Sequence, residues 1–525
     1  MGYLGGLISY RKFMFKKLLS VSGFTLLSRI TGLVRDVLQA AVLGHGLLSD
    51  AFVVAFRFPN WFRAVFGEGT LNPAFLPRYA ALHAKGEHEA AARFGDEVYS
   101  WQILIQAVLL VAALAAMPWI IRLTAPGFVG HPGQVELAAT LSRITFPYLI
   151  LTVVVVQLSA MLNAIEKFWA AAAWSNFLNL AMIATLLMAA WFPNAAYAGA
   201  WGIMLGGVGQ LVFMLWAARR DGIWLRLRWP RWTPEIKEFF VAIGAVTFGT
   251  LPVTFLPIVD TIIASLLPVG SMTALYYADR INQLPLGVLG IALGTVLLPD
   301  MSRRLAKGDV TGSDAAQNRA ASLALLLTLP FLVVFLAIPE PITRAIFAHG
   351  AFDRQAAAQT AMALAAYGVG LPAMVLVRIT AASFYARQET ATPARATVTS
   401  ILSNIAIKAA LVLGFGWGIA GIALGTALGA WVNVAMLVWF SKRAGYLNIV
   451  PSFRQALLPI VLAALMAGAG AVGGVLLIEH HVLVLGLFFT GFWRDLATLG
   501  LAMVLSGIGY GAVLLVFRRR LPLSR

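Results

Sequence analysis

The chain has 525 residues, of which 60% are hydrophobic and only 12% are charged, and its mean hydropathy is +0.83. Soluble globular domains carry about 25% charged residues, so this composition excludes that class and predicts a polytopic membrane protein. A net charge of +17 would suit nucleic acid binding, but the positions of the charges decide their meaning, and the absence of cysteine excludes disulfides and thiolate metal sites.

The first 17 residues, MGYLGGLISYRKFMFKK, carry a basic cluster that leads directly into a full-length apolar span. They have no small-residue cleavage site, so we expect residues 1–17 to be a retained cytoplasmic segment and not a cleaved signal peptide. Either Met1 or Met14 can be the natural start.

Apolar windows long enough to cross a bilayer, which takes about 20 residues, follow one another along the rest of the chain. Fourteen of them cover residues 18–43, 50–76, 99–121, 139–163, 171–192, 198–218, 238–266, 273–299, 320–338, 358–385, 396–414, 417–440, 455–478 and 495–517. The predicted fold class is therefore an all-α polytopic membrane protein with fourteen transmembrane helices.

The basic residues of the loops support this count. If the N-terminus is cytoplasmic, 27 of the 39 Lys and Arg residues fall in loops on the cytoplasmic side and five fall in loops on the other side. Because cytoplasmic loops of membrane proteins carry the excess of Lys and Arg, the asymmetry predicts fourteen spans and two cytoplasmic termini. The remaining seven basic residues lie within spans.

The loop 223–237, IWLRLRWPRWTPEIK, interleaves tryptophans with arginines. Such a pattern can bind single-stranded nucleic acid, but beside a membrane span it is typical of an interfacial anchor near anionic head groups. We favour the anchor and expect membrane lipids, not nucleic acid, as its partner.

An internal repeat divides the chain. An offset of 222 residues pairs Ala84-Lys85-Gly86-Glu87 with Ala306-Lys307-Gly308-Asp309, and an offset of 225 pairs Asn179 with Asn404. We infer two parallel six-helix halves with the substrate site between them, as in transporters built from parallel repeats. The predicted parts are an N-lobe (18–218), a basic and aromatic linker (219–237), a C-lobe (238–440), a glycine-rich pair of helices (441–517) and a cytoplasmic tail (518–525).

The first two spans contain seven charged residues. They are Arg29, Arg35, Asp36, Asp50, Arg57, Arg63 and Glu68. An arginine at the bilayer centre costs about 2.5–3.5 kcal/mol, so four of them facing lipid would cost roughly 10 kcal/mol. We therefore expect these side chains to face protein or a hydrated cavity that binds an anion.

The arginines of the first span suit a phosphate ligand. Arg29 and Arg35 are six residues apart, which is about 9 Å along a helix. The planar guanidinium donates bidentate hydrogen bonds to phosphate and keeps its proton in a poorly hydrated site. The alternative is that Arg29 extends to the interface or pairs with Asp36, seven residues further on.

Three charges of the second span share one face of an ideal helix. Asp50, Arg57 and Glu68 lie within roughly 20° of one another, so an ion pair between Arg57 and one of the carboxylates is an alternative to a role in the cavity. Arg63 lies well away from that face, and a kink at Pro59 would turn it toward the cavity. We therefore expect Arg63 to be functional.

The second half supplies further charges. Asp279 and Arg280 occupy the repeat position of Arg57 and Phe58, which places a basic residue at similar depth in each half, unless the two neutralise each other. Arg378 is a possible further support of the cavity.

Asp260, Asn404 and Lys408 lie within the seventh and eleventh spans. They could form either an ion pair or a site for a coupling cation, and we favour the pair, with Lys408 standing where a coupling cation would otherwise bind.

Motifs for enzymatic chemistry are missing from the sequence. It has no HExxH, Walker loop, aspartate-rich diphosphate motif or GxSxG, and its histidines fall in loops or at span ends. We therefore expect a transporter with no cofactor and no metal site, and not an enzyme.

Several long motifs resemble one family. They are SRITGLVRD, SDAFVVAFRFPNWFRAVFGEG, LPRYA, TAPGF, ITFPY, YYADRINQLPLGVLGIALGTVLLP and FYARQETATP. All are similar to the MurJ (MviN) family of bacterial lipid II flippases, in the multidrug/oligosaccharidyl-lipid/polysaccharide exporter superfamily. The resemblance implies two six-helix lobes around a V-shaped central cavity, followed by two C-terminal helices.

The same resemblance implies the site and the mechanism. The family's cationic cavity residues fall on Arg29, Arg35, Arg63 and Arg280, with Asp50 as an acidic partner, and they would bind the pyrophosphate of lipid II during alternating access. The protein would be a monomer in the bacterial inner membrane. Some members of the family have an acidic residue on the eleventh helix that suits sodium, whereas this chain has Lys408 there, which argues against sodium coupling.

Three alternatives remain. A flippase for another polyprenyl-pyrophosphate glycan, such as an O-antigen unit, also needs a basic cavity. A drug or cation antiporter would need an acidic or aromatic cavity, and an enzyme acting on polyprenyl diphosphate would need a carboxylate-metal motif.

Overall fold

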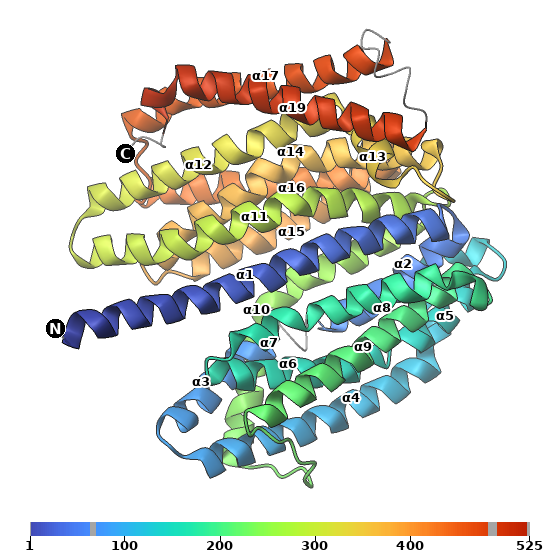
Figure 1. Ribbon diagram of the computed structural model, residues 1–525, viewed down its shortest axis with the longest axis vertical. Helices are drawn as coiled ribbons and strands as arrows, with labels where there is room; N and C mark the ends of the chain where they lie inside the picture. The colour runs from blue at the N-terminus through green and yellow to red at the C-terminus, as the bar shows by residue number, and fades with distance from the viewer. Residues whose placement is uncertain (1, 64–69, 481–490, 522–525) are drawn as a thin grey trace. The chain divides into compact units, whose positions relative to one another are not determined.

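The computed structural model describes residues 2–63, 70–480 and 491–521, with side chains except for those of residues 2–20, 248–253 and 288–296. All regular elements of these residues are helices, and they contain no β-strand. Two compact units, Met1–Ile262 and Ile263–Arg525, divide the chain within helix α10 (Figure 1). This division does not test the predicted boundaries of the N-lobe, linker and C-lobe, which stay a prediction.

Ten described segments are long and apolar enough to cross a membrane. They are α4 (His88–Thr124), α5 with α6 (Gln134–Ala164), α7 with α8 (Phe168–Leu187), α9 (Ala195–Arg220), α12 (Val310–Ala337), α14 (Arg354–Tyr385), α15 with a π-turn (Ala391–Gly414), α16 (Gly418–Arg443), α17 (Pro451–Glu479) and α19 (Phe492–Val516). They coincide with ten of the predicted spans, so the protein is an all-α polytopic membrane protein.

The other four predicted spans fall on helices that carry the intramembrane charges. These helices are α1 (Gly2–Leu43), α2 (Leu47–Phe62), α10 (Pro234–Ser265) and α11 (Ser271–Ala306). Among the described residues of these four helices, the Thr254–Ser265 part of α10 is recognised as a shorter apolar segment. The total of fourteen spans therefore stays a prediction.

Some predicted spans are divided in the structure; the window 171–192, for example, contains the end of α7 (Phe168–Ala173) and all of α8 (Ser175–Leu187). The window 139–163 contains the end of α5 (Gln134–Thr145) and most of α6 (Tyr148–Ala164), which are separated at Pro147 because proline has no N–H to donate. The window 50–76 contains most of α2 and the start of α3 (Leu71–Ala84); residues 64–69 lie outside the described residues.

The first unit packs α1 against α7, α8 and α9, and α2 against α5, α6 and α9. The predicted anchor loop after α9 lies along the first part of α4. The Asp96 carboxylate accepts hydrogen bonds from the backbone N–H of Arg226 (2.9 Å) and from the Arg228 guanidinium (2.8 Å), and the Ser100 hydroxyl accepts one from the Arg228 N–H (2.9 Å). Burial, with a smaller contribution from Asp96, raises the pKa of nearby Tyr79 to about 12. The loop is thus attached to the unit by specific hydrogen bonds.

In the second unit, α14 packs against α11, α12, α13 (Pro339–Phe347) and α16. The last two helices, α17 and α19, lie side by side, and α17 also packs on α12 (Figure 1). They approach closely at Gly474, where a Cβ atom would come within 2.5 Å of the Ala502 Cα. Glycine, which has no side chain, allows the two helices to come this close.

The internal repeat is visible in one turn of each unit. Gly86 has φ +78° and Gly308 has φ +75°, a backbone conformation that favours glycine. Each follows a helix, and the next residue donates its N–H to the carbonyl five positions earlier, Glu87 to Leu82 (3.1 Å) and Asp309 to Arg304 (2.9 Å). The 222-residue offset therefore pairs segments with the same local structure.

Candidate functional site

The charges of α1 form a buried cluster in the first unit. Arg35 and Asp36 are only 6% and 5% exposed. The Arg35 Nη2 atom lies 2.6 Å from the Asp36 Oδ1 atom, to which its Nε also donates at 3.2 Å. Its Nη1 donates to the Asn179 side-chain oxygen of α8 at 3.0 Å, and its guanidinium carbon lies 5.8 Å from the Phe56 ring centre. These contacts orient Arg35 firmly.

Asn179 is a site residue that the sequence did not reveal as such. Besides accepting from Arg35, its amide donates to the Ser28 carbonyl (3.0 Å) and to the Thr31 hydroxyl (3.1 Å), so α8 orients a full turn of α1. The one signal was the repeat, which pairs Asn179 with Asn404, and both side chains are 5% exposed.

Arg29 differs from Arg35 in its surroundings. Arg29 is half-buried, and its neighbours Leu26, Leu27 and Ile30 are exposed. The preceding residue, Ser28, is tied to α8 by a 3.0 Å hydrogen bond from the Ser175 hydroxyl. The predicted pair therefore consists of one enclosed arginine and one that is partly accessible.

The charges of α2 are separated along the helix. Asp50, in its first turn, is 3% exposed. Arg57 is half-buried and donates a hydrogen bond to the Thr261 hydroxyl of α10 at 3.0 Å. Its hydrogen-bond partner is therefore this hydroxyl and not the Asp50 carboxylate. Arg63 is half-buried and caps the C-terminal end of α2. Glu68, the other predicted partner of Arg57, lies outside the described residues.

A small hollow of the first unit adjoins Arg57. Phe58, Trp61, Thr124 and Pro257 also line it. The Trp61 indole donates to the Thr254 carbonyl of α10 at 2.6 Å, which closes one side. Helices α2 and α10, one from each predicted half of the sequence, are therefore joined by side-chain hydrogen bonds.

The second unit presents Asp279 and Arg280 on α11, both half-buried. Arg280 turns back along its own helix, with its guanidinium carbon 4.8 Å from the Tyr276 ring centre and its Nη2 3.2 Å from the Tyr276 hydroxyl. Asp279 accepts a hydrogen bond from the Gln283 amide. Arg378, on α14, is exposed.

Lys408 is fully buried on α15, although lysine is rarely enclosed. Its side chain passes over Gly425 of α16, and Asn404 lies over Gly429, so the two glycines make room for both polar side chains. Asp260 is half-buried on α10 and belongs to the first unit, so its pairing with Lys408 stays a prediction. Among the described residues, no group of three His, Asp or Glu side chains is placed to hold a metal.

A family model described as "Lipid II flippase MurJ" matches residues 39–492. The chain belongs to the MurJ family. It is 36% identical over 475 residues to the "Probable lipid II flippase MurJ" of Rhizobium tropici, covering 89% of this chain and 87% of that protein. It is 32% identical over 463 residues to the "Lipid II flippase MurJ" of Burkholderia cenocepacia, covering 86% and 88%.

Solved structures agree with this family at the level of the fold. A MurJ structure in an inward closed conformation has a TM-score of 0.78 at 24% identity and covers 95% of this chain and 99% of its own. An inward-facing MATE transporter of the MOP superfamily has a TM-score of 0.68 at 15% identity, covering 81% and 98%. The MurJ resemblance of the motifs and the all-α polytopic membrane fold are confirmed, while the count of fourteen spans stays a prediction.

Proposed function

We propose that this protein moves lipid II, the lipid-linked peptidoglycan precursor, from the cytoplasmic to the periplasmic leaflet of the bacterial inner membrane. The observation that supports this proposal is the family match over residues 39–492. In addition, the spans carry arginines that the positive-inside rule does not explain, because that rule concerns loops. Relatives in Rhizobium and Burkholderia bear the name of this activity.

The arginines supply the chemistry. In this proposal Arg29, Arg35, Arg63 and Arg280 bind the pyrophosphate and adjoining head group, because guanidinium groups match phosphate oxygens bidentately. Arg35 is held in one orientation by Asp36 and Asn179, so it would meet the anion with little loss of side-chain entropy. Arg29 and Arg63, which are half-buried, would make the mobile contacts.

Transport follows without any covalent step. The two lobes rock around the bound head group, while the polyprenyl tail stays in lipid, and no cofactor takes part. Both termini are cytoplasmic and the working unit is a monomer. A positively charged cavity lets the membrane potential assist, at about 2.3 kcal/mol per elementary charge per 100 mV.

Complementation of a flippase-depleted strain tests the proposal. We expect Arg29→Ala, Arg35→Ala, Arg63→Ala and Arg280→Ala each to prevent growth while membrane levels of the protein stay normal. The exposed Arg354, in a predicted periplasmic loop, gives the matched control Arg354→Ala, which should support growth. Growth of all four cavity variants would overturn the site assignment.

Competitive native mass spectrometry tests the substrate separately. Purified protein is offered lipid II, undecaprenyl phosphate and an O-antigen precursor together, with Arg29→Ala in parallel. We expect selective lipid II binding that the variant loses. Preference for the O-antigen precursor would assign a different polyprenyl-pyrophosphate glycan, and equal binding of all three lipids would mean that the tail dominates recognition.

A further inference from the structure

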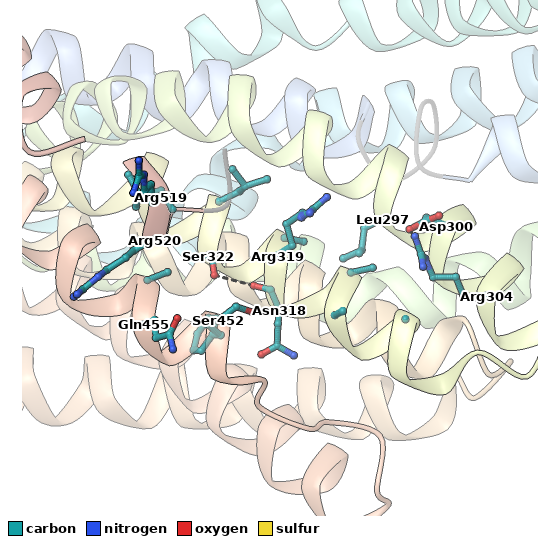
Figure 2. A pocket seen from close by; sticks show the side chains of 18 residues that line it. Leu297, Asp300, Arg304, Asn318, Arg319, Ser322, Ser452, Gln455, Arg519 and Arg520 are labelled. Carbon is teal, nitrogen blue, oxygen red and sulfur yellow. Dashed lines mark hydrogen bonds and ion pairs between the residues drawn. The ribbon is translucent and has the colours of Figure 1, made fainter. Parts of the chain in front are cut away.

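A cavity of about 630 Å³ lies in the second unit, away from the residues discussed above. It is bounded by the end of α11, the first half of α12, the start of α17 and the short turn Arg518–Arg520 (Figure 2). These elements border the chain between the eighth and ninth predicted spans, between the twelfth and thirteenth, and after the fourteenth. Each of these segments follows an even number of spans, so with a cytoplasmic N-terminus all three are predicted to be cytoplasmic. The cavity therefore lies at the predicted cytoplasmic membrane surface.

The lining of this cavity is strongly basic. It includes four arginines, Arg304, Arg319, Arg519 and Arg520, and one acidic residue, Asp300, which leaves a net charge of +3. Figure 2 shows the arginines distributed around it from three different elements.

Only Arg304 is neutralised by carboxylates. Its guanidinium donates to Asp300 at 3.0 Å and lies 3.4 Å from an Asp309 oxygen. Arg319, Arg519 and Arg520 make no ion pair with any acidic residue in the described part of the chain, and all three are exposed. Their positive charges are therefore available to an anion.

The floor of the cavity is polar and firmly held. The Asn318 amide donates to the Asn448 carbonyl (2.8 Å) and its oxygen accepts from the Val450 N–H (3.4 Å). The Asn448 amide in turn donates to the Asp314 carboxylate (2.6 Å), and the Ser322 hydroxyl donates to the Asn318 carbonyl (3.0 Å; Figure 2). This network fixes the position at which α17 begins.

The fixed start of α17 adds to the positive field. Ser452 and Phe453, in its first turn, line the cavity, and no side chain caps this helix end. The aligned peptide dipoles of a helix place partial positive charge at its N-terminus, which favours phosphate. The effect reinforces the arginines, which carry most of the charge.

Apolar side chains complete the cavity. Leu297, Leu323 and Leu521 line it together with Ala320 and Ala456. Below it, Leu326, Ile460 and Leu521 belong to one buried cluster. A site for inorganic phosphate alone would not need this apolar wall, whereas a lipid presents a charged phosphate joined to hydrocarbon.

We propose that this cavity binds the phosphate of an anionic phospholipid of the cytoplasmic leaflet. Basic pockets between transmembrane helices on this side of a membrane suit such head groups. The bound lipid would bridge the turn after α19 to α11 and α12. This site is independent of the proposed flippase activity.

The test is lipid binding by the full-length protein in detergent, measured by native mass spectrometry. Phosphatidylglycerol is compared with phosphatidylcholine and diacylglycerol of the same acyl chains. We expect the triple variant R319Q/R519Q/R520Q to bind phosphatidylglycerol roughly 100-fold more weakly, because each basic residue near an anionic surface contributes about fivefold. The exposed Arg93, Arg354 and Arg395, none of which lines the cavity, supply the matched control R93Q/R354Q/R395Q, which should bind as the parent does.

The outcomes separate the sources of binding. Selective retention of phosphatidylglycerol, lost only in the cavity variant, supports the proposal. Equal binding of diacylglycerol, or an equal loss in the control variant, would overturn it. Displacement of the lipid by millimolar inorganic phosphate would overturn the lipid assignment. Unchanged thermal unfolding of both variants excludes misfolding, and no arm depends on lipid II.

Discussion

The Arg35–Asp36 pair allows the structural and functional roles of an intramembrane arginine to be measured separately. Asp36 is 5% exposed and accepts two N–H groups of Arg35, at 2.6 and 3.2 Å. Asp36→Ala removes this carboxylate and leaves the buried guanidinium in place, where it still donates to the Asn179 side-chain oxygen. Removing one member of a buried ion pair costs about 3–5 kcal/mol, so we expect the free energy of unfolding to fall by that amount.

Replacing both members tests whether Arg35 also binds substrate. The double variant R35M/D36L replaces both charges of this pair by apolar side chains, and such replacements of buried ion pairs are commonly neutral or stabilising. We expect its unfolding free energy to return to within about 1 kcal/mol of the parent value, because both charges of the pair are removed together. The double variant should nevertheless fail to complement a flippase-depleted strain.

Stability is measured by unfolding in mixed micelles with increasing sodium dodecyl sulfate, and function by growth. An unchanged stability of Asp36→Ala would refute the inference that the ion pair stabilises α1. Normal growth of the stable double variant would refute a role of Arg35 in substrate binding and leave it a structural residue. A double variant that is as unstable as Asp36→Ala would show that packing, not charge, is decisive.

Three further predictions use other parts of the chain. Gly474→Ala should destabilise the α17–α19 pair by about 1–3 kcal/mol, because the new Cβ atom would meet Ala502. The control Gly473→Ala, which has open space around it, should be neutral or slightly stabilising. Equal unfolding curves of the two variants would contradict this prediction. The pKa of Asp309 is lowered chiefly by a hydrogen bond from a backbone N–H of α12. The stabilising effect of the ionised Asp309 carboxylate is therefore present above its unfolded pKa of about 3.9 and is lost as the pH falls through the lower folded value. The melting temperatures of the parent protein and of Asp309→Ala should converge below about pH 4. Lys408→Asp should make transport sodium-dependent, and sodium-indifferent transport would count against a cation site at this position.

The helices could be predicted because the membrane imposes their length and their composition. The window 358–385 corresponds to α14 (Arg354–Tyr385), and the window 198–218 to α9 (Ala195–Arg220). In the structure both helices begin a few residues before the predicted windows, where Asp353 and Asn194 accept hydrogen bonds from N–H groups of the first turn. Hydropathy does not detect these caps, since they lie outside the apolar segment.

The charged residues could be identified from the sequence, but their environments could not. Arg35 and Arg29 occupy the same helix, yet the first is enclosed and the second is half-buried. The difference depends on Asn179, which is 144 residues away from Arg35 in the chain and reaches it because α8 packs against α1. Helix periodicity predicts which residues share a face, and it says nothing about which neighbour covers that face.

The net charge of +17 illustrates how one property serves two purposes. Read along the sequence, Arg319 and Arg520 belong to separate loops and are explained by the positive-inside rule. In the fold they line one cavity, because α11, α12, α17 and the turn after α19 all border it. Loops of the same topological side must meet at the same surface, so charges that set orientation during insertion are brought together afterwards. A basic lipid site at that surface therefore requires only that the helix ends leave a hollow, and here they leave one of about 630 Å³.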